Sequence, residues 1–122
     1  MEILNKNEIL MKKGNTKYVF NKNSILELRA DRRYTDICLT GGRTFTSNKG
    51  IGECCSLINK ETETKHVLVT RIGKSLALNL NYYFEFNDKT LVLKFGCGKE
   101  VLLTAAQVKT LNKLLKKDKI GL

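Results

Sequence analysis

Two cations and a hydroxyl group gather around one glycine just past the middle of the chain. Arg71, Lys74 and Ser75 surround Gly73, a residue that favours a bend. Residues 76–80 then alternate large apolar with small or polar side chains, which is typical of a half-buried strand. A bend that carries such side chains at the start of a strand suits a phosphate group.

The same stretch does not indicate an enzyme. A Gly-Lys-Ser tripeptide ends at Ser75, as in a phosphate-binding P-loop, but Leu68 stands where that loop needs its first glycine. The two glycines of residues 96–98 lack the third glycine of a dinucleotide fingerprint, because Val101 occupies its place. The single histidine, His66, is the only imidazole base, and nothing in the sequence positions it beside Ser75. We therefore expect no catalytic site and no cofactor.

The four cysteines predict neither disulfides nor a metal site. They are Cys38, Cys54, Cys55 and Cys97. All four lie inside apolar patterns and none forms a Cys-x-x-Cys pair, so we interpret them as small buried side chains in a reducing compartment. No ligand spacing links them to His66.

The charge of the chain favours a polyanionic partner. The 122 residues include 22 Lys and Arg against 12 Asp and Glu, which gives a formal net charge of +10. For one small domain this excess favours DNA, RNA or an anionic membrane surface. Arg32 and Arg33 form a charged loop between two predicted strands, although an ordinary solvated loop is the alternative. No apolar run is long enough for a signal peptide or a membrane span, so we expect a cytoplasmic protein without membrane insertion.

Short antiparallel strands are predicted over most of the chain. They cover residues 9–13, 16–20, 25–30, 34–39, 43–46, 66–71, 76–80, 83–87, 90–95 and 100–103. In the third strand, Leu26 and Leu28 alternate with charged residues. Gly41 and Gly42 predict a tight turn between the fourth strand and the fifth.

Two segments change to a helical period. The first predicted helix has an apolar face of Ile51, Cys54, Cys55 and Ile58. Ser47 or Asn48 is positioned to cap it. The second helix starts at a capping box formed by Thr104 and Gln107, and its apolar stripe is Val108, Leu111 and Leu115. The predicted fold class is therefore mostly β with two helices (α+β), one in mid-chain and one at the C-terminus.

The bend and the strand after it resemble the signature of the LytTR family of bacterial DNA-binding domains. That signature is a hydrophobic residue, any residue, Arg, an aliphatic residue, His-Arg-Ser, two apolar residues and Val-Asn-Leu. Seven positions fit it: Val69, Arg71, Ile72, Ser75, Leu78, Asn79 and Leu80. Gly73 stands where the family has His, and Lys74 where it has Arg. The order of the elements is similar over residues 9–117, with a further match at the Thr104 cap.

The resemblance implies a LytTR-like domain over residues 9–122, with residues 1–8 as an N-terminal extension. Such domains are elongated and antiparallel, and they present loops, rather than a recognition helix, to the DNA major groove. The resemblance then implies duplex DNA as the partner and sequence-specific binding by a bacterial transcriptional regulator.

The positions that family members use for DNA contacts fall here on Arg33, with Arg32 beside it, on Lys74 and on Ala106. The expected DNA-binding residues are therefore Arg32, Arg33, Arg71, Lys74 and Ser75. Ala106 has no polar side chain, and Gly73 also removes one, so specific base reading is in question more than phosphate binding.

Three alternatives stay open. A LytTR-like protein-interaction module that has lost specific DNA reading would need a regulatory protein partner. An RNA-binding sheet would need exposed aromatic residues among residues 82–86. The resemblance also leaves open a homodimer on DNA, for which the sequence shows no surface.

Overall fold

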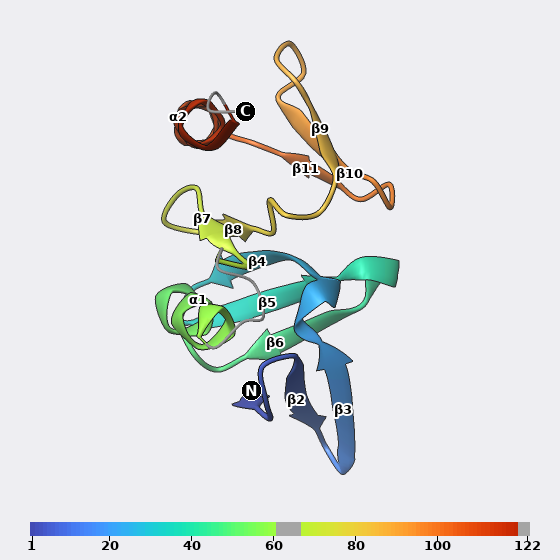
Figure 1. The fold of residues 1–122 in the computed structure, drawn as a ribbon. Coiled ribbons are helices and arrows are strands. Elements are labelled where there is room, and N and C mark those ends of the chain that lie inside the picture. Colours follow the sequence, from blue (N-terminus) through green and yellow to red (C-terminus); the bar gives the residue numbers. More distant parts are fainter. Residues whose placement is uncertain (61–66, 120–122) are drawn as a thin grey trace.

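The computed structural model describes residues 1–60 and 67–119, with side chains for residues 1–60 and 67–116. Over these residues the chain forms antiparallel β-sheets and two α-helices (Figure 1), which confirms the predicted fold class. The strands are β1 (Glu2–Ile3), β2 (Glu8–Lys13), β3 (Thr16–Asn21), β4 (Ile25–Asp31), β5 (Tyr34–Leu39), β6 (Thr44–Ser47), β7 (Thr70–Arg71), β8 (Leu76–Leu78), β9 (Phe84–Asn87), β10 (Val92–Phe95) and β11 (Glu100–Leu102). The helices are α1 (Ile51–Asn59) and α2 (Ala105–Lys119), and the short 3-10 turns are η1 (Lys22–Ser24) and η2 (Thr40–Gly42).

A five-stranded sheet in the order β6-β5-β4-β8-β7 forms the middle of the molecule. One hydrophobic core joins it to α1 and to the sheet β1-β2-β3, and a second core joins it to α2 and the sheet β11-β10-β9. Figure 1 shows the long axis that results, with α2 and β9–β11 at one end and the β2–β3 hairpin at the other. The layers place the loops at the ends of the central strands on the surface.

Strand β8 contributes to both cores. Ala77 packs in the core with α1, while Leu76 and Leu78 pack in the core with α2, and all three are almost fully buried. The predicted half-buried strand is therefore wrong, because β8 lies between β4 and β7 with a packed layer on each face. Asn79 follows, and its buried side chain donates from Nδ2 to the carbonyl of Ile25 at 2.8 Å, which fixes the end of β8 to the start of β4.

Strand β4 carries an irregularity that its sequence pattern does not show. The pairing of β4 with β5 shifts by one residue between Ile25 and Glu27, as in a β-bulge. Leu26 consequently packs in the core with α2, whereas Leu28 packs in the core with α1. The predicted regular alternation of β4 is wrong at this point.

Several local predictions are confirmed. Strands β2 and β3 form the predicted hairpin, and Gly41 and Gly42 both adopt φ of 84° in the turn before β6.

Other local predictions differ from the structure. The strand expected over residues 66–71 is reduced to β7, and His66 lies outside the described residues. Cys97 is exposed in the β10–β11 turn, so its predicted burial is wrong, while Cys38, Cys54 and Cys55 are buried.

Helix α1 has the predicted buried face but not the predicted cap. Its first turn follows Gly50, which makes no side-chain capping bond. Ser47 remains in β6, where it pairs with Thr35, and its hydroxyl accepts from the amide of Lys49 at 3.2 Å. Because β6 extends to Ser47, the helix starts too late for Ser47 or Asn48 to cap it.

Candidate nucleic-acid interface

A two-residue turn places Arg32 and Arg33 at one end of the central sheet. Asp31 at the end of β4 pairs with Tyr34 at the start of β5, so the two arginines alone form the connection. Both are exposed, and the Arg33 guanidinium lies 5.7 Å from the centre of the Tyr34 ring. Arg32 has φ of 58°, which is unusual for a residue with a long side chain. The turn therefore holds two guanidinium groups in solvent on a short, constrained segment.

The loop between β7 and β8 is closed by its own backbone and by Arg71. The amide of Ile72, a fully buried residue, donates to the carbonyl of Leu76 at 3.0 Å. Arg71 donates from Nη2 to the carbonyl of Lys74 at 2.8 Å. Arg71 is thus committed to bracing the bend, while the side chains of Lys74 and Ser75 remain exposed.

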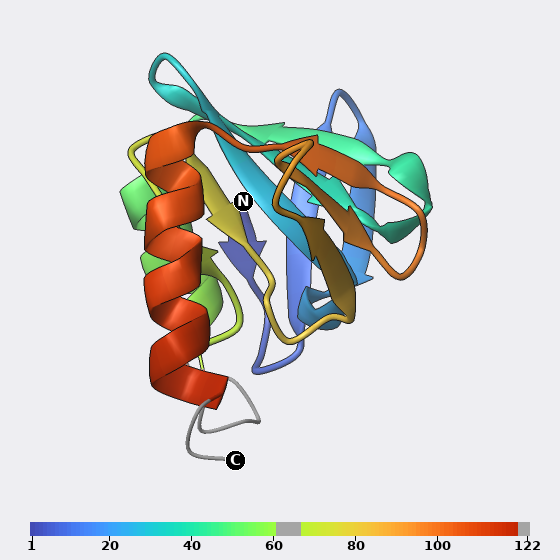
Figure 2. The ribbon, with the colours of Figure 1, turned by 90° about the horizontal axis from the view of Figure 1, so that it is seen from above.

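Two contacts bring this loop to its neighbours. The amide of Ala30, near the end of β4, donates to the carbonyl of Ser75 at 2.9 Å, so the β7–β8 loop lies directly beside the strand that leads into the arginine turn. A Cβ atom at Gly73 would lie 3.4 Å from Cγ of Gln107 in α2. Figure 2 shows the result, with the β4–β5 turn, the β7–β8 loop and the first turn of α2 at the same end of the molecule.

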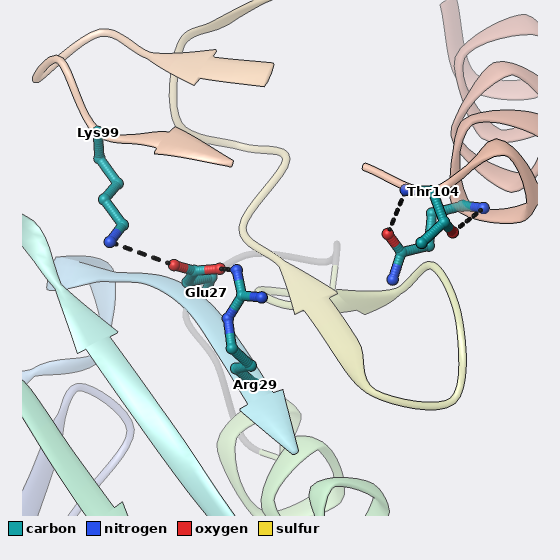
Figure 3. Close-up of polar contacts among 5 residues, drawn as sticks. Glu27, Arg29, Lys99 and Thr104 are labelled. Carbon is teal, nitrogen blue, oxygen red and sulfur yellow. Dashed lines mark hydrogen bonds and ion pairs between the residues drawn. The ribbon is translucent and has the colours of Figure 1, made fainter. Parts of the chain in front are cut away.

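The first turn of α2 is fixed by the predicted capping box, which is confirmed. The amide of Thr104 donates to Oε1 of Gln107 at 2.9 Å, and the amide of Gln107 donates to the Thr104 hydroxyl at 3.2 Å (Figure 3). Ala105 and Ala106 are exposed beside it. Ala106, at a position that family members use for DNA contacts, thus presents only a methyl group to solvent.

Gln107, in the first turn of α2, also lies at the place where the β4–β5 turn and the β7–β8 loop come together, and the sequence does not single it out for binding. The capping pattern identifies its bond to Thr104 but not its position beside Gly73, a residue far away in the sequence. Its Nε2 lies 3.7 Å from the place of a Gly73 Cβ, so an amide donor stands next to the bend. No local signal in the sequence could have revealed this.

Arg71 also links the cluster to α1. Its Nη1 atom lies 3.5 Å from where a Cβ would stand on Gly52, in the first turn of that helix. Burial raises the pKa of the nearby Cys55 thiol, and the positive charge of Arg71 offsets part of that rise. The Arg71 guanidinium therefore lies beside α1, and its charge acts on the Cys55 thiol in that helix.

A buried carboxylate connects the central sheet to the sheet β11-β10-β9. The side chain of Glu27 is 1% exposed, and its oxygens lie 3.0 Å from Nη2 of Arg29 and 3.6 Å from Nζ of Lys99 (Figure 3). Lys99 lies in the β10–β11 turn, so the ion pair joins the sheet β11-β10-β9 to β4. Burial first, and then the Glu27 carboxylate, raise the pKa of the Cys38 thiol. We assign this cluster to the scaffold.

The aromatic residues before and within β9 do not form an exposed sheet face. Tyr82, Phe84 and Phe86 pack against the second core. Tyr83 is exposed, but it precedes β9. A stacking surface for RNA bases is therefore not assembled on this sheet.

In the part of the chain that the structure describes, neither helix is long and apolar enough to cross a membrane. Among the same residues no group of three His, Cys, Asp or Glu side chains is placed to hold a metal ion.

Comparison with known proteins shows the fold. The structure is similar to the LytTr DNA-binding domain of a Bacillus cereus protein described as a methyl-accepting/DNA response regulator, with a TM-score of 0.67 and 18% sequence identity. The match covers 90% of this chain and 97% of that domain. No family model and no curated protein matches the sequence. The LytTR-like fold expected from the sequence is confirmed, in a divergent form.

Proposed function

We propose that the protein binds duplex DNA through the end of the molecule where the β4–β5 turn, the β7–β8 loop and the first turn of α2 meet. The observation that carries the proposal is the convergence of these three segments. The Ala30–Ser75 hydrogen bond and the position of Gln107 beside Gly73 bring together positions that the LytTR resemblance implies for DNA contacts. The fold shared with a LytTr DNA-binding domain supports the same partner.

Each side chain has a role that follows from its chemistry. Arg32 and Arg33 offer planar guanidinium groups that suit guanine edges or phosphate oxygens. Lys74 supplies a point charge for a phosphate, and the Ser75 hydroxyl supplies a neutral hydrogen bond. Arg71 braces the loop through the Lys74 carbonyl, so we assign it a positioning role.

Sequence reading would depend on few groups. Ala106 contributes no hydrogen bond, and Gly73 contributes no side chain. The arginine turn and the Nε2 donor of Gln107 are then the groups best suited to base edges, since Arg pairs with guanine and an amide N–H can donate to a purine N7. We propose on this basis a cytoplasmic bacterial regulator of transcription with a short sequence preference and strong phosphate binding.

The first test is fluorescence-anisotropy titration of random duplex DNA at low and at physiological salt. Arg33→Ala and Lys74→Ala should each weaken binding and make it less salt-dependent. Lys6→Ala is the matched control. Lys6 lies far from the proposed interface. Its neighbour Asn7 accepts a hydrogen bond from the amide of Lys22, just before β4 begins, whereas the arginine turn follows the end of β4.

Two results would contradict the proposal. Equal loss of affinity in all three variants would mean that the net charge acts only as a diffuse field. Binding that ignores Arg33 and Lys74 would favour the alternative of a protein-interaction module, for which the exposed Ala105 and Ala106 are the specific observation. A homodimer on DNA and a regulatory protein partner remain predictions.

A further inference from the structure

The tip of the β2–β3 hairpin concentrates positive charge in an unfavourable arrangement. Lys12 stands directly opposite Lys17 in the strand pairing, and Lys13 adjoins the turn at Gly14. All three lysines are exposed. Like charges directly opposite each other on a sheet face destabilise the pairing. A hairpin that retains this pair is suited to a partner that neutralises it.

The described residues provide no such partner within the chain. None of the ion pairs found there involves these three lysines. The carboxylates of the same sheet, Glu2 and Glu8, lie toward its other end, where they pair across the strands with Leu10 and Asn21.

A further cation adjoins the hairpin and is held in place. The Arg43 guanidinium lies 4.7 Å from the centre of the Tyr18 ring and 5.6 Å from that of Phe45. Tyr18 belongs to β3, and its ring stacks at a tilt against Phe45 with 5.1 Å between centroids. These contacts hold the guanidinium against Tyr18, which pairs with Met11 next to the Lys12–Lys17 pair.

The hairpin is placed to meet the same duplex as the loops. Figure 1 shows it at the end of the long axis opposite to α2. In Figure 2 its turn lies along the same upper edge as the β4–β5 turn and the start of α2. A rod-shaped ligand lying along that edge would contact the loops in one part and the hairpin in another.

We propose that the tip of the β2–β3 hairpin, through Lys12, Lys13 and Lys17, is a second DNA-backbone site, which binds phosphates beyond the segment contacted by the loops. The inference rests on the proposed function and extends it. Lysine side chains provide point charges for phosphates, so this contact would strengthen binding to every sequence alike. It would also relieve the Lys12–Lys17 repulsion in the bound state.

The test compares two variants that lose the same charge. K12Q/K17Q removes the opposed pair, and K6Q/K60Q removes two exposed lysines at other places. Each is titrated against a random duplex of about 30 base pairs over a range of salt. Loss of two phosphate contacts should reduce the slope of log affinity against log salt by about 1.8. If K12Q/K17Q and the parent bind DNA equally at 1 M salt, K12Q/K17Q should bind about 30-fold more weakly than the parent at 0.15 M salt.

Folding provides a separate readout. Because K12Q/K17Q removes a repulsion, its melting temperature should equal or exceed that of the parent. A structural role for the lysines would lower that temperature instead and would overturn the inference.

The remaining outcomes separate the inference from the proposed function. If R33A/K74A weakens binding and K12Q/K17Q does not, the hairpin site is refuted and the loop interface stands. If K12Q/K17Q and K6Q/K60Q weaken binding equally, the charge acts as a diffuse field and the site is refuted. If R33A/K74A has no effect, the proposed function fails and the inference fails with it. Binding to phosphatidylserine vesicles that requires Lys12 and Lys17, with DNA affinity unchanged, would assign the tip to a membrane surface and overturn the proposal.

Discussion

Replacing Arg32 by asparagine should stabilise the fold and weaken DNA binding at the same time. Arg32 adopts φ of 58° in the turn between β4 and β5. A left-handed conformation costs most L-residues about 1 to 2 kcal/mol, but asparagine adopts it more readily. A residue that is unfavourable for its own turn and is exposed in the proposed interface is one whose side chain we expect to serve binding.

Both effects have magnitudes that can be measured. Relief of part of the backbone cost should raise the free energy of unfolding of Arg32→Asn by about 0.5 to 1 kcal/mol. For a domain of this size that corresponds to about 2 to 6 °C in melting temperature. Loss of one phosphate contact should reduce the slope of log affinity against log salt by about 0.9. If Arg32→Asn and the parent bind equally at 1 M salt, the variant should then bind about fivefold more weakly at 0.15 M.

The matched control is Arg33→Asn. Arg33 lies outside the left-handed region, so this variant loses the same charge without relieving the backbone. It should bind DNA more weakly and gain no stability. Thermal unfolding by circular dichroism and anisotropy titration measure the two effects independently. If Arg32→Asn melts at a lower temperature than the parent, or binds with unchanged affinity and salt slope, the reasoning about this turn is refuted.

Four further predictions concern α2 and the cysteines. Ala106→Arg places a guanidinium on the exposed first turn of α2 and should increase DNA affinity in anisotropy titrations, whereas unchanged binding would place this turn outside the interface. Thr104→Ala removes half of the capping box and should lower the free energy of unfolding by about 1 kcal/mol in urea denaturation, with an unchanged midpoint contradicting the assignment. Cys97 is exposed and should react with a thiol reagent well before Cys38 and Cys55, which are buried and have raised thiol pKa values. Because these two pKa values are higher in the folded state, their contribution to stability is complete at neutral pH and is lost as the pH rises through the alkaline range, which pH-dependent thermal unfolding can measure.

The elements of this fold that the sequence predicts are those decided by neighbouring residues. The hairpin of β2 and β3, the turn at Gly41 and Gly42 and the capping box at Thr104 each depend on side chains within a few positions of one another. Propensity, turn chemistry and period are sufficient in such cases. The buried face of α1 belongs to the same group.

The incorrect predictions share a different cause. Whether β8 is buried on one face or two depends on which layers cover it, and these come from both ends of the chain. The bulge in β4 depends on its pairing with β5, and it reverses the side of the sheet to which Leu26 points. The exposure of Cys97 follows from the turn that carries it and not from the apolar residues around it. Each of these is decided by tertiary structure.

The candidate interface divides along the same line. The signature-like stretch around Gly73 marks Lys74 and Ser75, and the charged loop marks Arg32 and Arg33, so the members could be identified from the sequence. Their proximity could not, because it depends on the Ala30–Ser75 hydrogen bond between β4 and the β7–β8 loop, which are distant in the chain.

The departure from the LytTR signature at Gly73 is coupled to the start of α2 in the structure. Gly73 stands where the signature has His, and a Cβ there would already lie 3.4 Å from Cγ of Gln107. A larger side chain would have to displace Gln107 or turn away from it, and displacement would break the bond by which Gln107 holds the amide of Thr104. The missing side chain on the β7–β8 loop and the amide on α2 therefore occupy one space. If this end of the molecule reads bases, the polar group at that point comes from α2, and a change at Gly73 would alter both the reading surface and the start of the helix.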